Sequence, residues 1–257
     1  MSSEWTRPLL SAVVVVHDEE AQLAECLQTM SFVDELVVVL DRCRDRSPEI
    51  ARQFTENLVE GAWDREGPRR HAGIDICTGM WIVEVDADER VSAELAEEIR
   101  HVAAHSAAAW HLIPVDNYIG ERRVRWGWGA SFGKGAYAGL YRNGAKRWGD
   151  RERVHPAGTL SGPQGPTLQA RLIHCVDRNI SDMLARLDRY SSARAKDLRE
   201  SGDIGSYHRN LRRIATRFWK CYVSRRGYRE GPYGLLIALC AALYPILSYL
   251  KARLEKE

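Results

Sequence analysis

Apolar residues in the first half of the chain follow two alternating patterns. Short, nearly continuous apolar runs are separated by segments in which apolar residues recur at helical spacing. The runs predict strands over 9–16, 35–40, 81–85 and, later, 167–173, and the spaced segments predict helices over 21–30, 47–57, 70–77 and 92–105. Buried parallel strands have continuous apolar sequences. The alternation therefore predicts an α/β fold with a mostly parallel sheet and helices on both faces.

Acidic side chains follow three of these strands. Asp18 and Glu19 follow the first strand, Asp41 the second, and Asp86 and Asp88 the third. Ligands of open α/β sheets bind at the carboxyl ends of the strands, so these side chains are expected to line one crevice. Two carboxylates at positions i and i+2 can share one divalent cation, because such cations prefer oxygen ligands. An isolated Asp-X-Asp triplet is also common in solvated loops, so the preceding strand is what favours a metal site.

The absence of two nucleotide-binding motifs argues against two classes of enzyme. The sequence contains neither GxGxxG nor GxxxxGK[ST], which argues against dinucleotide-dependent redox enzymes and P-loop enzymes. A nucleotide diphosphate held by acidic residues and a metal remains compatible with the pattern. The six cysteines form no CxxC pair, which favours free thiols in a reducing compartment. The polar N-terminus, followed by a short apolar run, predicts no secretory signal.

The last third of the chain has a different character. Residues 179–199 predict a helix, and residues 204–229 predict a second one that carries eight Lys or Arg and no acidic residue. Apolar and aromatic residues recur in the second helix at spacings of three and four, which is typical of a basic amphipathic helix. Residues 231–250 then contain no charged residue and are interrupted by Pro232 and Pro245.

This composition favours attachment of the tail to an anionic membrane surface. The preferred interpretation is a pair of interfacial or re-entrant helices that could also form a homodimer. A spanning helix and plain packing against the α/β domain remain open alternatives. The aromatic residues fit no RNP pattern, so nucleic-acid binding is not expected. The residues predicted to contact the membrane are Arg212, Arg213, Phe218, Trp219, Lys220, Arg225 and Arg226.

Several motifs in combination resemble those of a known family. The matching segments are 13–20, with Asp18 where Asn is usual, 37–51, 67–73, with His71 where Asn is usual, 78–90, 140–142 and 154–155. The chain resembles inverting glycosyltransferases of family 2 with the GT-A fold, and among them the lipopolysaccharide-core glucosyltransferase type. No single motif is specific, but the combination spans most of the chain. The resemblance implies a nucleotide-sugar-binding catalytic domain over 1–178 and a helical membrane-associating tail over 179–257.

The resemblance also implies roles at the nucleotide. Asp41 would accept a hydrogen bond from the uracil imide, Glu19 would contact the uridine, and Arg70 would flank the base. Asp86 would face the ribose or the metal. Two simpler alternatives remain: Asp41 could cap the helix that follows it, and Arg70 could be a solvated charge at a helix start.

For the metal, the resemblance implies that Asp88 ligates Mg²⁺ or Mn²⁺ on the diphosphate. His174, placed just after the last predicted strand, would complete the ligand set. The cation would stabilise the departing UDP as a Lewis acid. The simpler alternative is that His174 is a core histidine with no role in metal binding.

The catalytic base is where the sequence departs from the family. An inverting transfer needs a group that takes the proton of the acceptor hydroxyl, and the resembled type has His-Glu where this chain has His155-Pro156. Asp150 and Glu152 are the favoured substitutes, with His155 as an orienting or substitute group. Both acids could instead pair with neighbouring arginines. The Trp-, Gly- and Arg-rich residues 120–149 are interpreted as an acceptor-side wall or a lid, with ordinary loop packing as the alternative.

These expectations combine into one functional hypothesis. The chain is predicted to be a metal-dependent inverting glycosyltransferase that uses a UDP-sugar, with UDP-glucose the expected donor. Its acceptor would be a lipid-linked or lipopolysaccharide-core-like glycan at the cytoplasmic face of the inner membrane. A nucleotidyltransferase is one alternative, disfavoured because residues 17–20 form no Gly-rich basic loop. A catalytically inactive membrane-bound scaffold is another, supported by the missing His-Glu.

Overall fold

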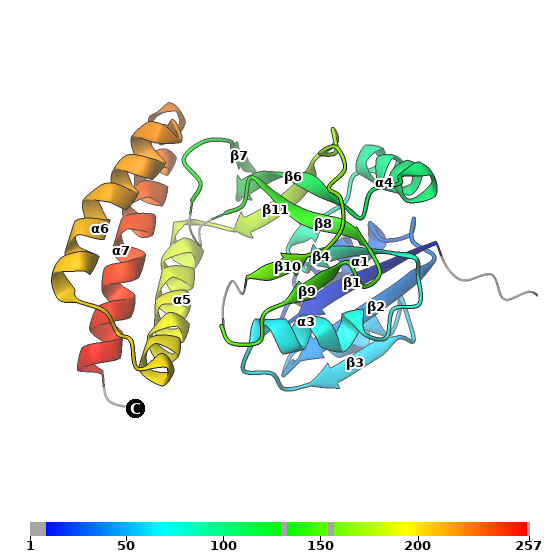
Figure 1. The fold of residues 1–257 in the computed structure, drawn as a ribbon, viewed down its shortest axis with the longest axis horizontal. Helices are drawn as coiled ribbons and strands as arrows, with labels where there is room; N and C mark the ends of the chain where they lie inside the picture. Colours follow the sequence, from blue (N-terminus) through cyan, green and yellow to red (C-terminus); the bar gives the residue numbers. More distant parts are fainter. Residues whose placement is uncertain (1–8, 130–132, 154–156, 256–257) are drawn as a thin grey trace, which may run out of the picture. The chain divides into compact units, whose positions relative to one another are not determined.

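The computed structural model describes residues 9–129, 133–153 and 157–255 (Figure 1). These residues form two compact units. The first contains 9–115, 136–151 and 157–174, and the second contains 116–129, 133–135, 152–153 and 175–255. The chain passes from the first unit to the second for the last time after residue 174, close to the predicted domain boundary at residue 178. The segments 116–129, 133–135 and 152–153, expected in the first domain, group with the second unit.

Four parallel strands form the part of the sheet that matters for the site. Their order is β3-β2-β1-β4, and β1 pairs in parallel with both β2 and β4. Every residue of β1 is buried, as its continuous apolar sequence predicts. The strands are β1 (Leu10–Val16), β2 (Glu35–Asp41), β3 (Leu58–Gly61) and β4 (Trp81–Asp86). The sequence missed β3, a short strand with two exposed residues.

Antiparallel strands extend this sheet beyond β4. β8 (Ala136–Arg142) pairs with β4, and β6 (Trp110–Ile119) pairs with β8. The order continues through β11 (Leu172–Asp177) to β5 (Glu89–Arg90). β7 (Arg122–Val124) pairs with β6, and β9 (Lys146–Trp148) pairs with β10 (Gly158–Leu160). The residues interpreted as an acceptor-side wall or a lid, 120–149, therefore contain the paired strands β7, β8 and β9, and their place at the acceptor stays a prediction.

Helices cover both faces of the sheet, as predicted. α1 (Leu23–Gln28), α2 (Ser47–Ala51) and α4 (Ala93–His105) share one core with alternate residues of β1, and α3 (Glu66–Ile74) packs on the other face. Gly73 allows α3 to approach the sheet closely, because a Cβ atom there would lie 2.5 Å from a methyl group of Val39. α3 begins four residues earlier than predicted, and α2 ends six residues earlier.

The second unit is built around three long helices, α5 (Ile180–Ser201), α6 (Tyr207–Trp219) and α7 (Pro232–Leu254). Asn179 caps α5 through the N–H of Asp182. α7 packs against both α5 and α6, and Ile237 and Ala241 on α7 are fully buried. A π-helical turn, η1 (Lys220–Ser224), and a 3₁₀ turn, η2 (Gly227–Glu230), connect α6 to α7.

Two expectations for the tail need correction. The basic helix expected over 204–229 ends at Trp219, and the two prolines do not interrupt the apolar segment. Pro232 occupies the first turn of α7, where its missing N–H costs nothing, and Pro245 is held inside the helix by packing on both sides. Within the described residues, α7 is the one helix long and apolar enough to cross a bilayer, and 56% of its most apolar 18-residue window is buried.

Candidate functional site

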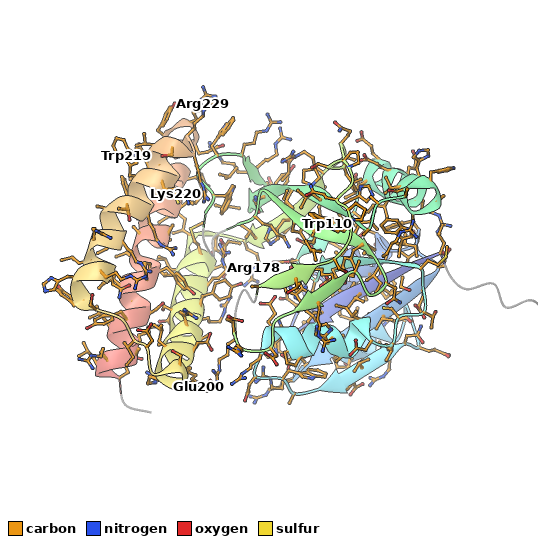
Figure 2. The ribbon with its side chains drawn as sticks, in the orientation of Figure 1. Trp110, Arg178, Glu200, Trp219, Lys220 and Arg229 are labelled. Atoms are coloured by element: carbon orange, nitrogen blue, oxygen red, sulfur yellow. The ribbon has the colours of Figure 1, made fainter. Side chains whose placement is uncertain are left out.

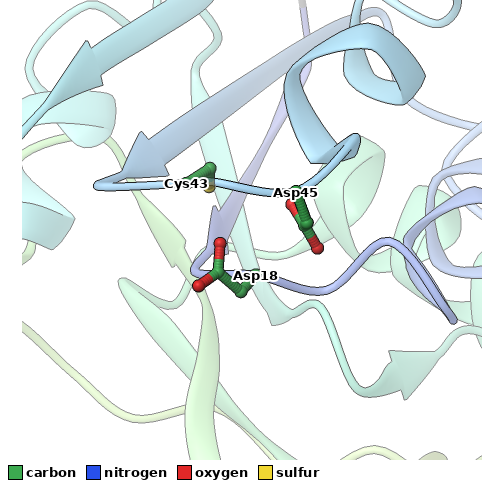
Figure 3. Close-up of side chains that lie close together, drawn as sticks. All are labelled: Asp18, Cys43 and Asp45. Carbon is green, nitrogen blue, oxygen red and sulfur yellow. The ribbon is translucent and has the colours of Figure 1, made fainter.

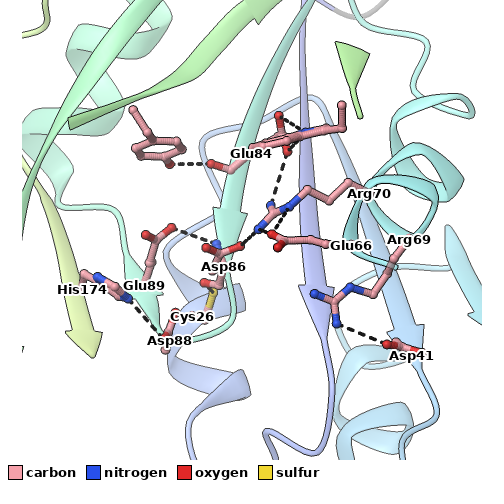
Figure 4. Close-up of polar contacts among 12 residues, drawn as sticks. Cys26, Asp41, Glu66, Arg69, Arg70, Glu84, Asp86, Asp88, Glu89 and His174 are labelled. Atoms are coloured by element: carbon pink, nitrogen blue, oxygen red, sulfur yellow. Dashed lines mark hydrogen bonds and ion pairs between the residues drawn. The ribbon is translucent and has the colours of Figure 1, made fainter. Parts of the chain in front are cut away.

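The strand ends bring the predicted acidic residues to one edge of the sheet (Figure 4). β1 lies between β2 and β4, with Val16 opposite Leu40 and Val15 opposite Asp86. Asp41 therefore ends one neighbour of β1, and Asp86 ends the other. The predicted acidic residues therefore lie at the same edge of the sheet.

Asp41 is almost fully buried, with a side chain 1% exposed. Its carboxylate accepts hydrogen bonds from Arg42 Nε at 2.9 Å, the Trp63 backbone N–H at 3.1 Å and Arg69 Nη1 at 3.2 Å. Burial raises the pKa of Asp41, but these hydrogen bonds and the two guanidinium charges outweigh it and hold the pKa below its usual value. Asp41 does not cap α2, whose N-cap is Arg46. The carboxylate is thus kept ionised and fixed in position.

The adjacent residues Arg69 and Arg70 of α3 serve different carboxylates. Arg69 contacts Asp41, whereas the Arg70 guanidinium bonds to Glu66, to Glu84 and, at 2.9 Å, to Asp86. Arg70 is mostly buried, so it is not a solvated charge. The structure therefore places Arg70 at the Asp86 end of the site, and it is Arg69 that lies beside the predicted uracil partner.

A buried charge cluster lies behind Asp86, and the sequence interpretation missed it. Glu84 accepts from Lys146 Nζ at 2.7 Å and from Trp148 Nε1 at 2.9 Å. Burial raises the pKa of Glu84, but Lys146 and Arg70 outweigh it and lower the pKa overall. The one sequence signal was a glutamate inside the otherwise apolar run Trp81-Ile-Val-Glu-Val. The cluster fixes Arg70, and through it the Asp86 carboxylate.

Asp88 and His174 form the open part of the site. His174 Nε2 lies 3.3 Å from Asp88 Oδ2, and the Asp88 side chain is 29% exposed. His174 is within β11, opposite Glu89 of β5, and not after a strand as predicted. Glu89 accepts the Asp86 backbone N–H at 2.8 Å and so shapes the turn that presents Asp88. A carboxylate and an imidazole side by side are a donor set that fits Mn²⁺ or Mg²⁺.

Glu19 follows β1 and is held at its backbone. Its N–H donates to Ser47 Oγ at 2.9 Å, and its carboxylate accepts from Gln22 Nε2 at 2.7 Å. Burial raises the pKa of Glu19, and the negative charges of Asp88 and Asp45 raise it further. Glu19 therefore belongs to the same acidic environment as Asp88.

Asp18, Cys43 and Asp45 form a second acidic group, which the sequence did not predict (Figure 3). Their ligand atoms lie within 4.8 Å of one another. Asp18 accepts the Arg44 N–H at 2.7 Å, and Asp45 accepts the Glu20 N–H at 2.8 Å. These bonds tie the loop after β1 to the loop after β2, which gives the group a structural role.

Two of the three residues proposed for the base, Asp150 and Glu152, lie among the described residues. Asp150 is exposed in the first unit, where it lines a cavity of about 440 Å³ with His71 and Trp148. Glu152 groups with the second unit, and His155 lies outside the described residues. Arg153, a possible partner for the two acids, instead bonds to Asp197 and Glu200.

Comparison with known proteins adds independent information. The model of glycosyl transferase family 2 matches residues 11–153, more than half of the chain. The lipopolysaccharide core biosynthesis glycosyltransferase LpsC of Rhizobium meliloti is 22% identical over 254 residues, which are 94% of this chain and 91% of LpsC. The uncharacterized glycosyltransferase RT0209 of Rickettsia typhi is also 22% identical, over 95% of this chain and 86% of its own.

Among solved structures, S. aureus TarS 1-349 in complex with UDP aligns with a TM-score of 0.51. The alignment covers 95% of this chain and 91% of TarS at 12% sequence identity. At that identity the likeness concerns the fold, and it confirms the predicted GT-A architecture. The family match decides against a nucleotidyltransferase: the chain belongs to glycosyl transferase family 2 and is a glycosyltransferase.

Proposed function

We propose that this glycosyltransferase moves a sugar, with inversion, from a UDP-sugar to a lipid-linked glycan and uses a divalent cation. The observation that carries the proposal is the placement of Asp41 and Asp86 at the ends of β2 and β4, the two strands that flank β1, with Asp88 just after Asp86. TarS has been solved with UDP, and LpsC is named for lipopolysaccharide core biosynthesis. These likenesses support a UDP-sugar donor, with UDP-glucose expected, and a lipopolysaccharide-core-like acceptor.

At the nucleotide end, the ionised Asp41 carboxylate accepts the uracil imide N–H. Its low pKa keeps it an acceptor at neutral pH, and Arg69 holds it in place from one side. Glu19 contacts the uridine, and Asp86 faces the ribose. Because Arg70 binds Asp86, Arg70 positions the ribose contact and does not flank the base.

At the diphosphate end, Asp88 and His174 hold Mg²⁺ or Mn²⁺. The cation, when bound, stabilises the negative charge that develops on the departing UDP. The partial exposure of Asp88 leaves room for a ligand, and its contact with His174 keeps the two donor atoms close together.

Inversion requires a base on the acceptor side. The acceptor hydroxyl loses its proton to a carboxylate as its oxygen bonds to the anomeric carbon, while the bond from that carbon to UDP breaks on the opposite face. Asp150 and Glu152 are the proposed bases, with His155 as the orienting or substitute group. The acceptor class favours a peripheral or monotopic enzyme at the cytoplasmic face of the inner membrane, and a homodimer through the C-terminal helices is also part of the proposal.

UDP release by the purified full chain tests the proposal. UDP-glucose and other UDP-sugars are incubated with Mn²⁺, with Mg²⁺ and with chelator, and the melting temperature is recorded in parallel. A UDP-sugar is expected to raise the melting temperature, and UDP release is expected to need the metal. If no UDP-sugar shifts melting or is turned over, the proposal fails and an inactive scaffold is favoured.

A further inference from the structure

The second unit exposes an apolar groove between α6 and α7. Leu211 and Phe218 of α6 and Leu239 and Leu243 of α7 line this groove, which has a volume of about 380 Å³. Leu211, Leu239 and Leu243 are 45%, 43% and 40% exposed. Leu235, one turn before Leu239, continues the same row. A row of large apolar side chains on a well-packed helical unit is unusual on a soluble surface.

Basic residues border this groove on the same helix. Between Asp203 and Glu230 the chain has eight Lys or Arg and no acidic residue. Arg209, Arg212 and Lys220 of this stretch are exposed. In α6, Arg212 follows the groove residue Leu211 directly, so the charged row and the apolar row lie next to each other along the helix. Figure 2 shows Trp219, Lys220 and Arg229 toward the same end of this unit.

The positive charges are crowded. Burial lowers the pKa of Arg213, and the like charges of Arg209, Arg217 and Arg194 lower it further. Arg225, predicted at the membrane, is instead half-buried and donates to the Trp128 carbonyl at 2.7 Å. A basic stretch without acidic residues, beside an apolar groove, matches one chemistry in particular, an anionic headgroup above acyl chains.

We propose that the groove between α6 and α7, with its border of arginines, is the surface by which this protein docks on an anionic lipid bilayer. Leu239 and Leu243 enter the acyl region, Trp219 lies at the headgroup level, and Arg209 and Arg212 contact lipid phosphates. α7 lies along the surface and does not cross the bilayer, because Ile237 and Ala241 on its other faces are packed in the protein core. The proposal adds a binding surface to the proposed function and does not depend on it.

Vesicle sedimentation tests the surface directly, with the full chain and without any nucleotide sugar. Vesicles of phosphatidylcholine alone are compared with vesicles that also contain phosphatidylglycerol. The protein is expected to bind the anionic vesicles at least about tenfold more tightly, and binding should weaken as salt is added. Equal affinity for both vesicles, or binding to neither, would overturn the proposal.

A matched pair of leucine variants tests whether vesicle binding depends on the groove or on any exposed apolar side chain. Leu239→Asp is expected to lower vesicle affinity about tenfold or more. Leu184→Asp is the control, because Leu184 is 49% exposed on α5 and does not line the groove. Equal losses in both variants would contradict the assignment of the groove.

A matched charge pair covers the case in which Leu239→Asp does not fold. Arg209→Glu with Arg212→Glu changes only exposed side chains and should lower affinity for anionic vesicles about tenfold. Arg189→Glu with Lys196→Glu, on the exposed surface of α5, changes the net charge equally and should have little effect. Sedimentation equilibrium without lipid completes the test: a dimer that Leu239→Asp dissociates, without vesicle binding by the parent protein, would assign the groove to a second copy and overturn the proposal.

Discussion

The first unit buries charge, whereas the second unit exposes apolar side chains. Asp41, at the sheet edge, and Glu84, within β4, are 1% and 2% exposed, and each is surrounded by cationic or N–H donors. On the helices, Leu239 and Leu243 are more than a third exposed. Both features run against the usual distribution of residues between interior and surface.

The comparison shows why the fold tolerates both the buried charges and the exposed apolar side chains. A buried charge is tolerated only when its partners replace water, so the first unit had to supply Lys146, Arg69 and Arg70 at fixed positions. An exposed leucine costs the isolated protein little and needs no partner in the structure. The first unit therefore holds Asp41 and Glu84 in place before a ligand binds, and the apolar side chains of the second unit are left exposed.

The largest expected effect is at Asp88, a partly exposed carboxylate just after the end of β4 that contacts His174. Asp88→Asn should reduce metal-dependent UDP release by about a thousandfold, because metal stabilisation of the leaving group is worth several kcal/mol. Steady-state kinetics across a Mn²⁺ titration provide the measurement. Glu97→Gln, at an exposed acid of α4, is the control. Unchanged kinetics in the Asp88 variant would contradict the metal-binding role of Asp88. The contrast between the buried Asp41 and the partly exposed Asp88 would then have no functional meaning.

The next effect is on stability, at the buried charge cluster. Glu84→Gln should lower the free energy of unfolding by about 3 kcal/mol, because it leaves Lys146 buried without its counter-charge. The double variant Glu84→Gln with Lys146→Met should recover part of this loss. Urea unfolding of the three proteins measures both changes. A loss below about 1 kcal/mol in the single variant would mean that water reaches the cluster, against the burial described here.

Much of this contrast was accessible from the sequence. A buried parallel strand is apolar throughout and polar where it leaves the sheet, so β1, β2 and β4 and the positions of Asp41, Asp86 and Asp88 followed from local pattern. The absence of acidic residues between Asp203 and Glu230 could also be read directly from the sequence.

The interaction partners of these groups could not be predicted from the sequence in the same way. The predicted start of α3 was four residues late, and helical phase decides which of two adjacent arginines faces which carboxylate, so Arg70 was placed where Arg69 lies. Lys146 pairs with a residue 62 positions away, which no local pattern reveals. The continuity of α7 through Pro245 depends on packing against α5 and α6, which overrides the local preference of proline.

A smaller effect is expected on the pH dependence of stability. The pKa of Asp41 is lowered in the folded protein, so its ionised form contributes stability that is complete above the unfolded value, about 3.9, and is lost as the pH falls through the folded value. Asp41→Asn should therefore cost about 1.5 kcal/mol near neutral pH and progressively less in acid. Chemical unfolding from about pH 7 to about pH 3 measures the difference. A cost independent of pH would mean that Asp41 is not ionised in the fold, and Asp75→Asn, at an exposed acid that ends α3, supplies the control.

The smallest effect is expected at the exposed apolar side chains of the second unit. Leu243→Ser should change the free energy of unfolding by less than about 0.5 kcal/mol in the absence of lipid, because much of the side chain is already in water. Leu187→Ser on α5, where the side chain is 5% exposed, should cost about 2 kcal/mol or more, because it leaves a cavity and a buried hydroxyl. Thermal and urea unfolding of both variants give the comparison. If the two losses were equal, Leu243 would be packed in the folded protein, and the apolar face would already have its partner within the chain.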